Sequence, residues 1–230
     1  MKLKNLHLVI LVGMMIFALG CDKGDFPFPP NQNLPHVMLI HASPDAPAVD
    51  VYLDDALFAK SLEYPNNTRY TTLREGENSV KLTIAETSDV VLEKNLDLAA
   101  ETYYSVFACD VAANIDAWVV QDQFLDPTLD SAQLRFVHLS PDAPTVDVTI
   151  NDGTVLFSAV SFKENTAFLS LPIGQYTLQI KLAGTATVVL EIEDLVLAPS
   201  VIYTIWAKGL VEGEGAQSLG AEIIMNRIKL

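Results

Sequence analysis

The chain has 230 residues, a formal net charge of −15 and a mean hydropathy of +0.28, and half of its residues are hydrophobic. This length and apolar content suffice for one or two domains with ordinary cores. With 14 basic against 29 acidic side chains, the chain cannot readily form the basic face that nucleic-acid binding needs, so we expect no nucleic-acid partner. Two cysteines also exclude a disulfide-dense scaffold and a four-cysteine zinc site.

The first twenty residues have the layout of an export signal. Lys2 and Lys4 precede an unbroken apolar run over residues 8–19, which is too short to span a bilayer well. The alternative, a buried N-terminal helix, is disfavoured because the run has no amphipathic period and is followed by a polar, proline-rich stretch. We therefore predict a signal peptide over residues 1–20.

Cys21 is the predicted site of lipid attachment. Ala18-Leu19-Gly20-Cys21 resembles the lipobox of bacterial lipoproteins, although leucine is more usual where Ala18 stands and a small residue where Leu19 stands. Several acyl chains on one cysteine hold a protein firmly in a membrane. Residues 21–35 then form the lipidated cysteine and a proline-rich tether. We expect an exported protein, lipid-anchored through Cys21 in the bacterial envelope at the outer membrane, with its periplasmic or surface orientation open.

An internal repeat organises the rest of the chain. The motif HASPDAPAVDV at residues 41–51 returns as HLSPDAPTVDV at residues 138–148. The register persists to the end, where YSVFA at residues 104–108 matches YTIWA at residues 203–207. We predict a first unit over 36–124, a polar joint over 125–132 and a second unit over 133–230.

Each unit has a strand-like pattern. Apolar and polar residues alternate over short runs bounded by Pro, Gly, Asn and Asp, and no stretch has a sustained helical period. About seven runs fit each unit, and we therefore predict an all-β protein of two tandem seven-stranded immunoglobulin-like β-sandwiches. In the first unit these runs cover residues 36–42, 48–54, 67–73, 79–85, 88–93, 102–109 and 116–121.

The repeat also separates core positions from surface positions. Tyr104, Val106 and Ala108 are apolar in both copies, which predicts a core face. Cys109 corresponds to Lys208 and is expected on the opposite face, as a partly exposed thiol without a basic neighbour that would activate it. If Cys21 is acylated, Cys109 has no disulfide partner. Phe107 and Trp206 match each other, which predicts a shared packing role.

The doubled motif resembles the domain of unknown function 4397 family of bacteria. Residues 41–51 and 138–148 carry the resemblance, which covers nearly all of the chain after the tether. It implies exported or cell-surface β-sandwich modules, here of a Bacteroidetes-like envelope lipoprotein. It implies no established activity, so no catalytic residues are carried over from the family.

The motif itself is a candidate site with two interpretations. In the ligand interpretation, its carboxylates bind a cation such as calcium, but each copy supplies only two. In the structural interpretation, the prolines fix a corner, the serine and first aspartate cap it, the histidine hydrogen-bonds the turn, and the second aspartate points outward. We favour the structural interpretation and expect no metal or cofactor. The residues concerned are His41, Ser43, Asp45, Asp50, His138, Ser140, Asp142 and Asp147.

Catalysis is not expected. The sequence has no Gly-x-Ser-x-Gly, no phosphate-binding glycine loop and no His-Glu-x-x-His. A Ser–His–Asp arrangement would have to form inside one rigid proline turn, because Ser140 and Asp142 are two residues apart. We predict that the protein is not an enzyme.

Two aromatic residues are candidates for a glycan-binding platform. Tyr52 and Trp118 become Thr149 and Glu222 in the second unit, so such a platform would be unique to the first. The alternative, that they cover the interface between the units, is favoured. Asp130-Ser131-Ala132 also resembles a short O-glycosylation signal of Bacteroidetes, which makes Ser131 a candidate modification site.

The leading functional hypothesis is a non-enzymatic envelope lipoprotein that serves as a structural or adhesive interaction module, with an unidentified partner. The alternative is a glycan- or polysaccharide-binding lipoprotein, with calcium as an aid to binding.

Overall fold

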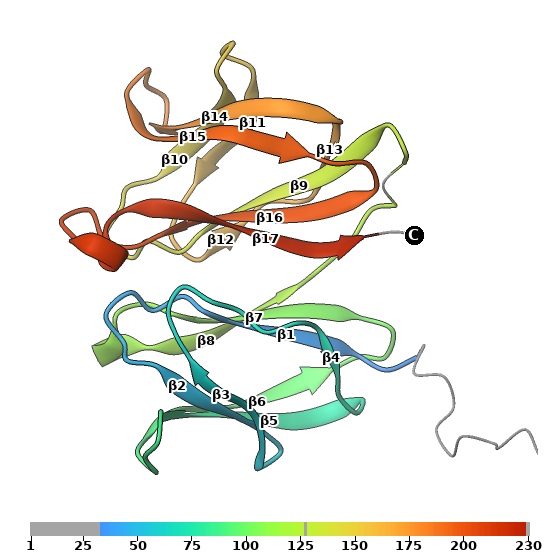
Figure 1. Cartoon of the computed structure of the whole chain (residues 1–230), viewed down its shortest axis with the longest axis vertical. Coiled ribbons are helices and arrows are strands. Elements are labelled where there is room, and N and C mark those ends of the chain that lie inside the picture. The colour runs from blue at the N-terminus through green and yellow to red at the C-terminus, as the bar shows by residue number, and fades with distance from the viewer. Residues whose placement is uncertain (1–32, 127, 229–230) are drawn as a thin grey trace, which may run out of the picture. The chain divides into compact units, whose positions relative to one another are not determined.

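The computed structural model (Figure 1) describes residues 33–126 and 128–228. The predicted signal peptide, Cys21 and most of the tether lie outside these residues. Gln32–Leu230 form one compact unit that contains both repeats. Over the described ranges, no helix is both long enough and apolar enough to cross a membrane.

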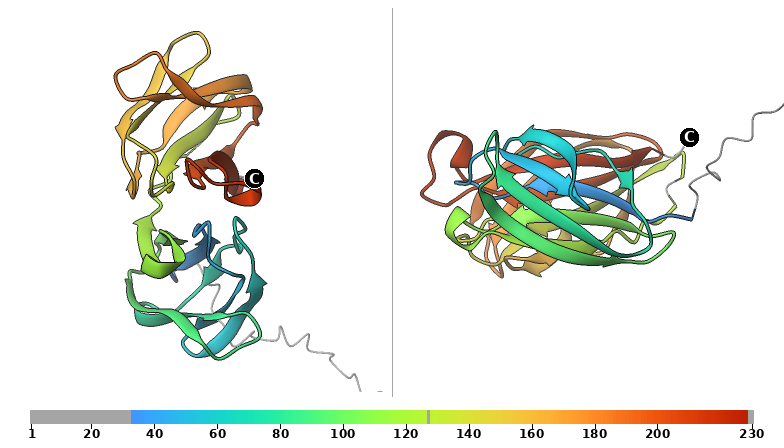
Figure 2. Two further views of the ribbon diagram at one scale, coloured as in Figure 1. Left: turned by 90° about the vertical axis from the view of Figure 1, so that its left-hand side faces the viewer. Right: turned by 90° about the horizontal axis from the view of Figure 1, so that it is seen from below.

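The first repeat folds into two facing four-stranded sheets (Figures 1 and 2). One sheet has the order β4-β1-β7-β8 and the other β3-β2-β5-β6; we call them the β1 sheet and the β2 sheet. The strands are β1 (His36–His41), β2 (Val49–Leu53), β3 (Ala56–Leu62), β4 (Thr71–Thr72), β5 (Gly76–Ile84), β6 (Val90–Leu98), β7 (Tyr103–Cys109) and β8 (Asp116–Gln121).

The second repeat has the same plan. Its β9 sheet has the order β12-β9-β16-β17 with β13 also paired to β9, and its β10 sheet has the order β11-β10-β14-β15. In each repeat the first strand pairs in parallel with the last strand but one, β1 with β7 and β9 with β16. The strands are β9 (Ser131–His138), β10 (Val146–Ile150), β11 (Val155–Val160), β12 (Glu164–Asn165), β13 (Leu169–Pro172), β14 (Gly174–Leu182), β15 (Val188–Leu197), β16 (Val201–Lys208) and β17 (Gly220–Ile228).

The structure confirms the all-β class and the two sandwiches. The predicted count of seven strands in each unit is wrong, because the described residues form eight strands in the first repeat, β1 to β8, and nine in the second, β9 to β17. In the first repeat, β3 was not predicted and the run 67–73 shrinks to β4. β3 is mostly exposed or half-buried and contains a bulge, so its sequence lacks the alternation that marks a half-buried strand. β9 begins at Ser131, inside the predicted joint.

Each sandwich encloses one apolar core. Tyr104, Val106 and Ala108 lie in the first core, and their equivalents Tyr203, Ile205 and Ala207 lie in the second, as predicted. Each tyrosine hydroxyl accepts a hydrogen bond from the backbone amide five residues upstream, at 3.1 Å from Ala99 and 3.2 Å from Ala198. Each buried tyrosine hydroxyl is therefore satisfied by the turn that precedes its own strand.

A third apolar cluster joins the two repeats. It is formed by the sides of the β1 and β9 sheets that face away from the sandwich cores. Phe107 and Trp206, which occupy equivalent positions, are both fully buried in it. The cluster comprises Met38, Ile40, Ala42, Phe107, Cys109 and Val120 from the first repeat, and Val137, Leu139, Trp206 and Ile224 from the second.

The prediction that Cys109 is partly exposed is wrong. Its side chain does lie on the face opposite the core, but that face packs in the cluster between the repeats, and Cys109 is fully buried. Burial raises the pKa of its thiol to about 12, so the thiol stays protonated at neutral pH. A buried, protonated thiol is a poor nucleophile.

A buried ion pair crosses the same boundary. A guanidinium nitrogen of Arg135 lies 2.6 Å from Asp122 Oδ1, and both side chains are almost completely shielded from solvent. Asp122 Oδ2 accepts hydrogen bonds from the hydroxyls of Tyr70 at 2.6 Å and Ser105 at 2.9 Å. Asn226 donates to the Tyr70 hydroxyl at 3.1 Å, which extends the network back into the second repeat. Because the partners come from both repeats, this network is complete only when the repeats pack against each other in this arrangement.

We predict that Asp122→Ala strongly destabilises the protein. The substitution leaves the Arg135 charge buried without its partner, which costs about 3–5 kcal/mol of unfolding free energy. Urea denaturation measures this loss. Arg74→Ala, which removes an exposed pair with Asp54, is the control and should change stability little. Equal denaturation midpoints for the two variants would contradict the prediction.

Candidate functional site

The repeated motif forms a corner at which the chain passes from one sheet to the other. Residues 42–48 connect β1 to β2, and the equivalent segment connects β9 to β10. Pro44 and Pro47 lie in the first corner, where their fixed φ angles favour a bend over a continued strand.

The motif histidines hold their own corner. His41 Nε2 donates to the carbonyl oxygen of Pro47 at 3.0 Å, and His138 Nε2 donates to that of Pro144 at 3.1 Å. Because a carbonyl oxygen only accepts, Nε2 carries the proton, and Nδ1 is left as a buried acceptor that has no partner in the part of the chain that the structure describes. Both rings are fully buried, and burial lowers the pKa of each histidine below its ordinary value of 6.5. Both are therefore neutral at pH 7.

The first aspartate of the motif does not cap its own turn, contrary to the prediction. Asp45 Oδ1 accepts the amide of Ala112 at 2.7 Å. Asp142 accepts the amide of Val211, with its two oxygens at 3.0 and 3.1 Å. Both aspartates therefore connect their corner to the loop after β7 or β16. Their partners are far away in the sequence, so the sequence did not predict these contacts.

The motif serines differ between the copies. Ser140 Oγ donates to the carbonyl oxygen of Gly209 at 2.7 Å, in the loop after β16. Ser43 Oγ is buried without a hydrogen-bond partner among the described residues. The predicted capping of the turn by serine is therefore replaced by a long-range contact in one copy.

The second aspartate points away from the core, as strand alternation predicts, because its neighbours Val49 and Val51 lie in the core. Asp50 is nevertheless only 5% exposed, because the bulge of β3 and the turn after β5 cover its carboxylate. Its Oδ1 accepts the amide of Ser61 at 2.8 Å and its Oδ2 accepts that of Glu86 at 3.2 Å. Both donors have left-handed backbones, with φ of 49° and 64°. The bond from Ser61 is the largest cause that lowers the pKa of Asp50.

The second repeat reproduces this clamp. Asp147 Oδ1 accepts the amide of Ala159 at 2.7 Å and Oδ2 that of Gly184 at 2.8 Å. These residues again have positive φ, 54° and 70°. Hydrogen bonds from the Gly184 and Ala159 amides lower the pKa of Asp147. In both copies the first donor lies at the bulge of the strand next to the corner, β3 or β11.

Apart from Ser43, the polar side chains of the motif therefore hydrogen-bond to backbone groups of their own sandwich. Ser140 donates to a carbonyl oxygen, and its nearest motif contact is Asp142, at 3.4 Å, rather than an imidazole. Within residues 33–126 and 128–228, no group of three or more His, Cys, Asp and Glu side chains is arranged to hold a metal ion.

The two candidate aromatic residues lie on different sheets. Tyr52 is half-buried on β2, where Lys81 Nζ lies 5.4 Å from its ring centroid. Trp118 is half-buried on β8, with its ring 5.8 Å from that of Phe107, and it packs against the cluster between the repeats. They do not form one platform, and Trp118 covers the boundary between the repeats.

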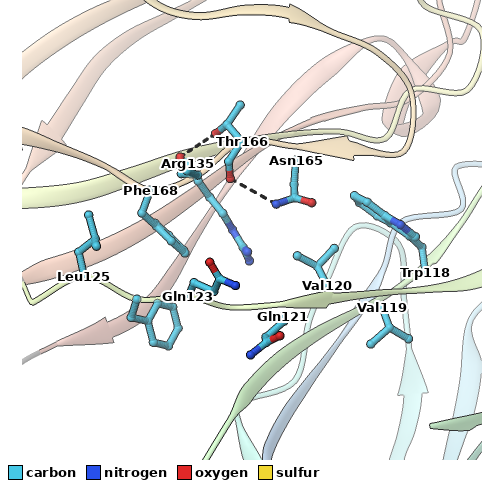
Figure 3. Close-up of a pocket in the computed structure, with 12 residues that line it drawn as sticks. Trp118, Val119, Val120, Gln121, Gln123, Leu125, Arg135, Asn165, Thr166 and Phe168 are labelled. Atoms are coloured by element: carbon cyan, nitrogen blue, oxygen red, sulfur yellow. Dashed lines mark hydrogen bonds between the residues drawn. The ribbon is translucent and has the colours of Figure 1, made fainter. Parts of the chain in front are cut away.

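A pocket of about 510 Å³ lies beside Trp118 (Figure 3). Figure 3 shows Trp118 and Leu125 at opposite ends, with Arg135 extending toward the middle. No sequence pattern predicts this pocket, because its walls come from segments far apart in the chain. The one signal in the sequence is the charged residue Arg135 within the apolar run of β9. Its lining comprises Trp118, Val119, Val120, Gln121, Gln123, Phe124, Leu125, Arg135, Asn165, Thr166, Ala167 and Phe168.

The pocket combines apolar surfaces with amide groups. Trp118 and Phe168 supply aromatic rings, and Gln121, Gln123 and Asn165 supply side-chain amides. The Arg135 guanidinium lies 4.7 Å from the Phe168 ring centroid and is already bound to Thr204, Ser105 and Asp122. Such walls suit a neutral, polar ligand with an apolar face, a description that fits a sugar ring.

We predict that the buried histidines make stability fall as the pH drops from about 7 to 5. Below the ordinary histidine pKa of 6.5, the unfolded chain binds protons that folded His41 and His138 do not, so the unfolding free energy decreases. The clamp aspartates have lowered pKa values and lose their contribution only below the ordinary value of 3.8. Urea denaturation across this range measures the slope.

The double variant His41→Gln, His138→Gln should have a shallower slope in the same range. The double variant should keep some pH dependence of stability, because burial also lowers the pKa of His36. An unchanged slope in the double variant would show that the two corner histidines do not titrate as argued.

Comparison with known proteins bears on the motif and both sandwiches. No curated protein matches the chain. The model of one family, described as a domain of unknown function (DUF4397), matches residues 35–149 and again residues 132–224. The two matches overlap and together include both corners and nearly all of the described strands. The chain therefore belongs to the DUF4397 family, as a tandem pair of its repeat units.

Proposed function

We propose that this protein is a non-enzymatic lipoprotein of the bacterial envelope whose two sandwiches act as a structural or adhesive interaction module. The observation that carries the proposal is the commitment of the motif aspartates and histidines to backbone groups in both copies. Groups used in this way build a scaffold and leave few side chains for chemistry. Function then depends on the surfaces that the scaffold presents.

The motif geometry favours a binding module over a hydrolase. A nucleophilic serine needs an imidazole within hydrogen-bond reach, whereas the protonated Nε2 of His138 is directed to Pro144. Burial holds both histidines neutral, with Nδ1 enclosed away from solvent. Neither imidazole is placed to exchange a proton with a substrate.

The envelope location rests on the sequence of residues 1–35. Lipid on Cys21 would fix the chain at a membrane surface, and the proline-rich tether would lead to the first strand at His36. A net charge of −15 suits a protein that must remain soluble beside an anchor of this kind.

Labelling with radioactive palmitate in a bacterial host tests the anchor. We expect the wild-type chain to carry label in the membrane fraction, and Cys21→Ser to lose both label and membrane association. Cys109→Ser is the matched control and should remain labelled. Label retained by Cys21→Ser would overturn the proposed anchor. Protease shaving of intact cells then distinguishes surface display from a periplasmic orientation.

Glycan binding is the second candidate function. The observation in its favour is the pocket beside Trp118, where an indole ring and three side-chain amides line one cavity. In this candidate function, calcium would be held by sugar hydroxyls and side-chain amide oxygens, because no carboxylate of the described residues lines the pocket.

Glycan arrays and calorimetry, each with and without calcium, separate the two candidates. If glycans bind, Trp118→Ala should weaken binding by about tenfold or more, because stacking on an aromatic ring supplies over a kcal/mol. Tyr52→Ala, on the other sheet, is the matched control and should bind normally. Equal loss of binding in both variants would exclude the pocket as the glycan site. No glycan binding in any condition would favour the structural role.

A further inference from the structure

The second sandwich contains a cavity that neither candidate function uses. Its volume is about 180 Å³, and it lies at the end of the core beside the corner motif. Its walls come from both sheets of the sandwich, with Val146 and Ile180 on one side and Ala207 on the other. Apart from His138, the residues that line it are apolar.

The cavity has a mouth that solvent can reach. Val189 and Val211 belong to its lining and are 37% and 45% exposed. A packing defect sealed inside a core would not place such exposed side chains in its wall. The cavity is therefore accessible to a molecule in solution.

The loop over the cavity distinguishes the second repeat from the first. Ala112 and Val211 are equivalent, since each donates its amide to the first motif aspartate. Ile115 and Leu219 are equivalent as well, since each immediately precedes the last strand of its repeat. Residues 113–114 separate the first pair, and residues 212–218 separate the second. Ile115 packs against its core, whereas Leu219 lines the cavity.

The longer loop of the second repeat has a closed conformation that its own backbone contacts hold. The Leu210 amide donates to the carbonyl oxygen of Gln217 at 2.8 Å. A Cβ atom on Gly209 would lie 2.1 Å from Ser218 O, and one on Gly213 would lie 2.2 Å from Gln217 O. The loop therefore closes on itself so tightly that both positions require glycine. This fixed conformation sets the position of Leu219 at the cavity.

We propose that this cavity binds the end of a neutral aliphatic chain of about six carbons. An apolar cavity of about 150 Å³ stays dry and accommodates a six-carbon ring, so this one has the matching capacity. An occupant supplies the dispersion contacts that an empty cavity denies its walls. The loop carries Glu212 and Glu214, both exposed, which disfavours a fatty-acid carboxylate at the mouth.

The test uses the Cys21→Ser chain, so that no attached lipid competes, with 1-hexanol as the probe and hexanoate as its charged counterpart. Methyl NMR spectra report binding. We expect saturable shifts at Val146, Ile180 and Leu190, no shifts at the first-repeat equivalents Val49, Leu82 and Leu92, and weaker binding of hexanoate. Shifts that do not saturate, that occur equally in both repeats, or that are as strong with hexanoate would overturn the proposal.

Filling the cavity supplies the matched comparison. Ala143→Leu places a larger side chain in the lining and should weaken 1-hexanol binding by about tenfold or more. Ala46→Leu makes the same change in the first corner and should leave binding unchanged. If Ala143→Leu does not fold, Val211→Phe with control Ala112→Phe tests the mouth instead. Undiminished binding in the folded lining variant would overturn the assignment.

Discussion

The structure depends on a carboxylate that binds two backbone amides at each corner. Asp50 holds Ser61 and Glu86, and Asp147 holds their equivalents in the second repeat. In each repeat one clamped amide lies at the bulge of β3 or β11 and the other in the turn after β5 or β14, and all four residues have positive φ, which is strained for Ser61, Glu86 and Ala159. An ionised aspartate offers two acceptor oxygens and forms strong bonds to backbone N–H groups. The corner, the adjacent bulge and the hairpin turn are thereby fixed together.

This constraint explains why the most distinctive sequence feature is a poor guide to binding. The two corners are nearly identical in sequence because each carries the chain from one sheet to the other. Most of their polar atoms hydrogen-bond within their own sandwich and are not available to a ligand. Features that differ between the repeats lie elsewhere. Arg135 stands where the first repeat has Met38, by the equivalent pairing of β1 with β7 and β9 with β16. The loop after β16 is likewise longer than its counterpart, so the repeats differ at the buried boundary between them and in one loop beside a cavity.

The packing between the repeats makes two similar domains into one unit with its own properties. Phe107 and Trp206 contribute matched aromatic bulk, while Arg135 and Asp122 contribute a buried charge pair. Apolar packing tolerates small shifts between the repeats, whereas a buried ion pair requires its two charged groups to stay in contact. The pair therefore favours one arrangement of the repeats over others. The pocket beside Trp118 exists only because this arrangement brings β8 and the segment around Phe168 together.

The sequence by itself determined the repeat, the all-β class, the core face of Tyr104, Val106 and Ala108, and the corner at each motif, because these follow from periodicity and local backbone chemistry. It did not determine β3, whose bulge breaks the alternation, or the partners of Asp45 and Asp50, which come from later strands and loops of the same repeat. Tertiary structure alone decided that Cys109 is buried and that Trp118 borders a pocket. Alternation assigns a side chain to one face of a sheet, but only the folded chain decides what covers that face.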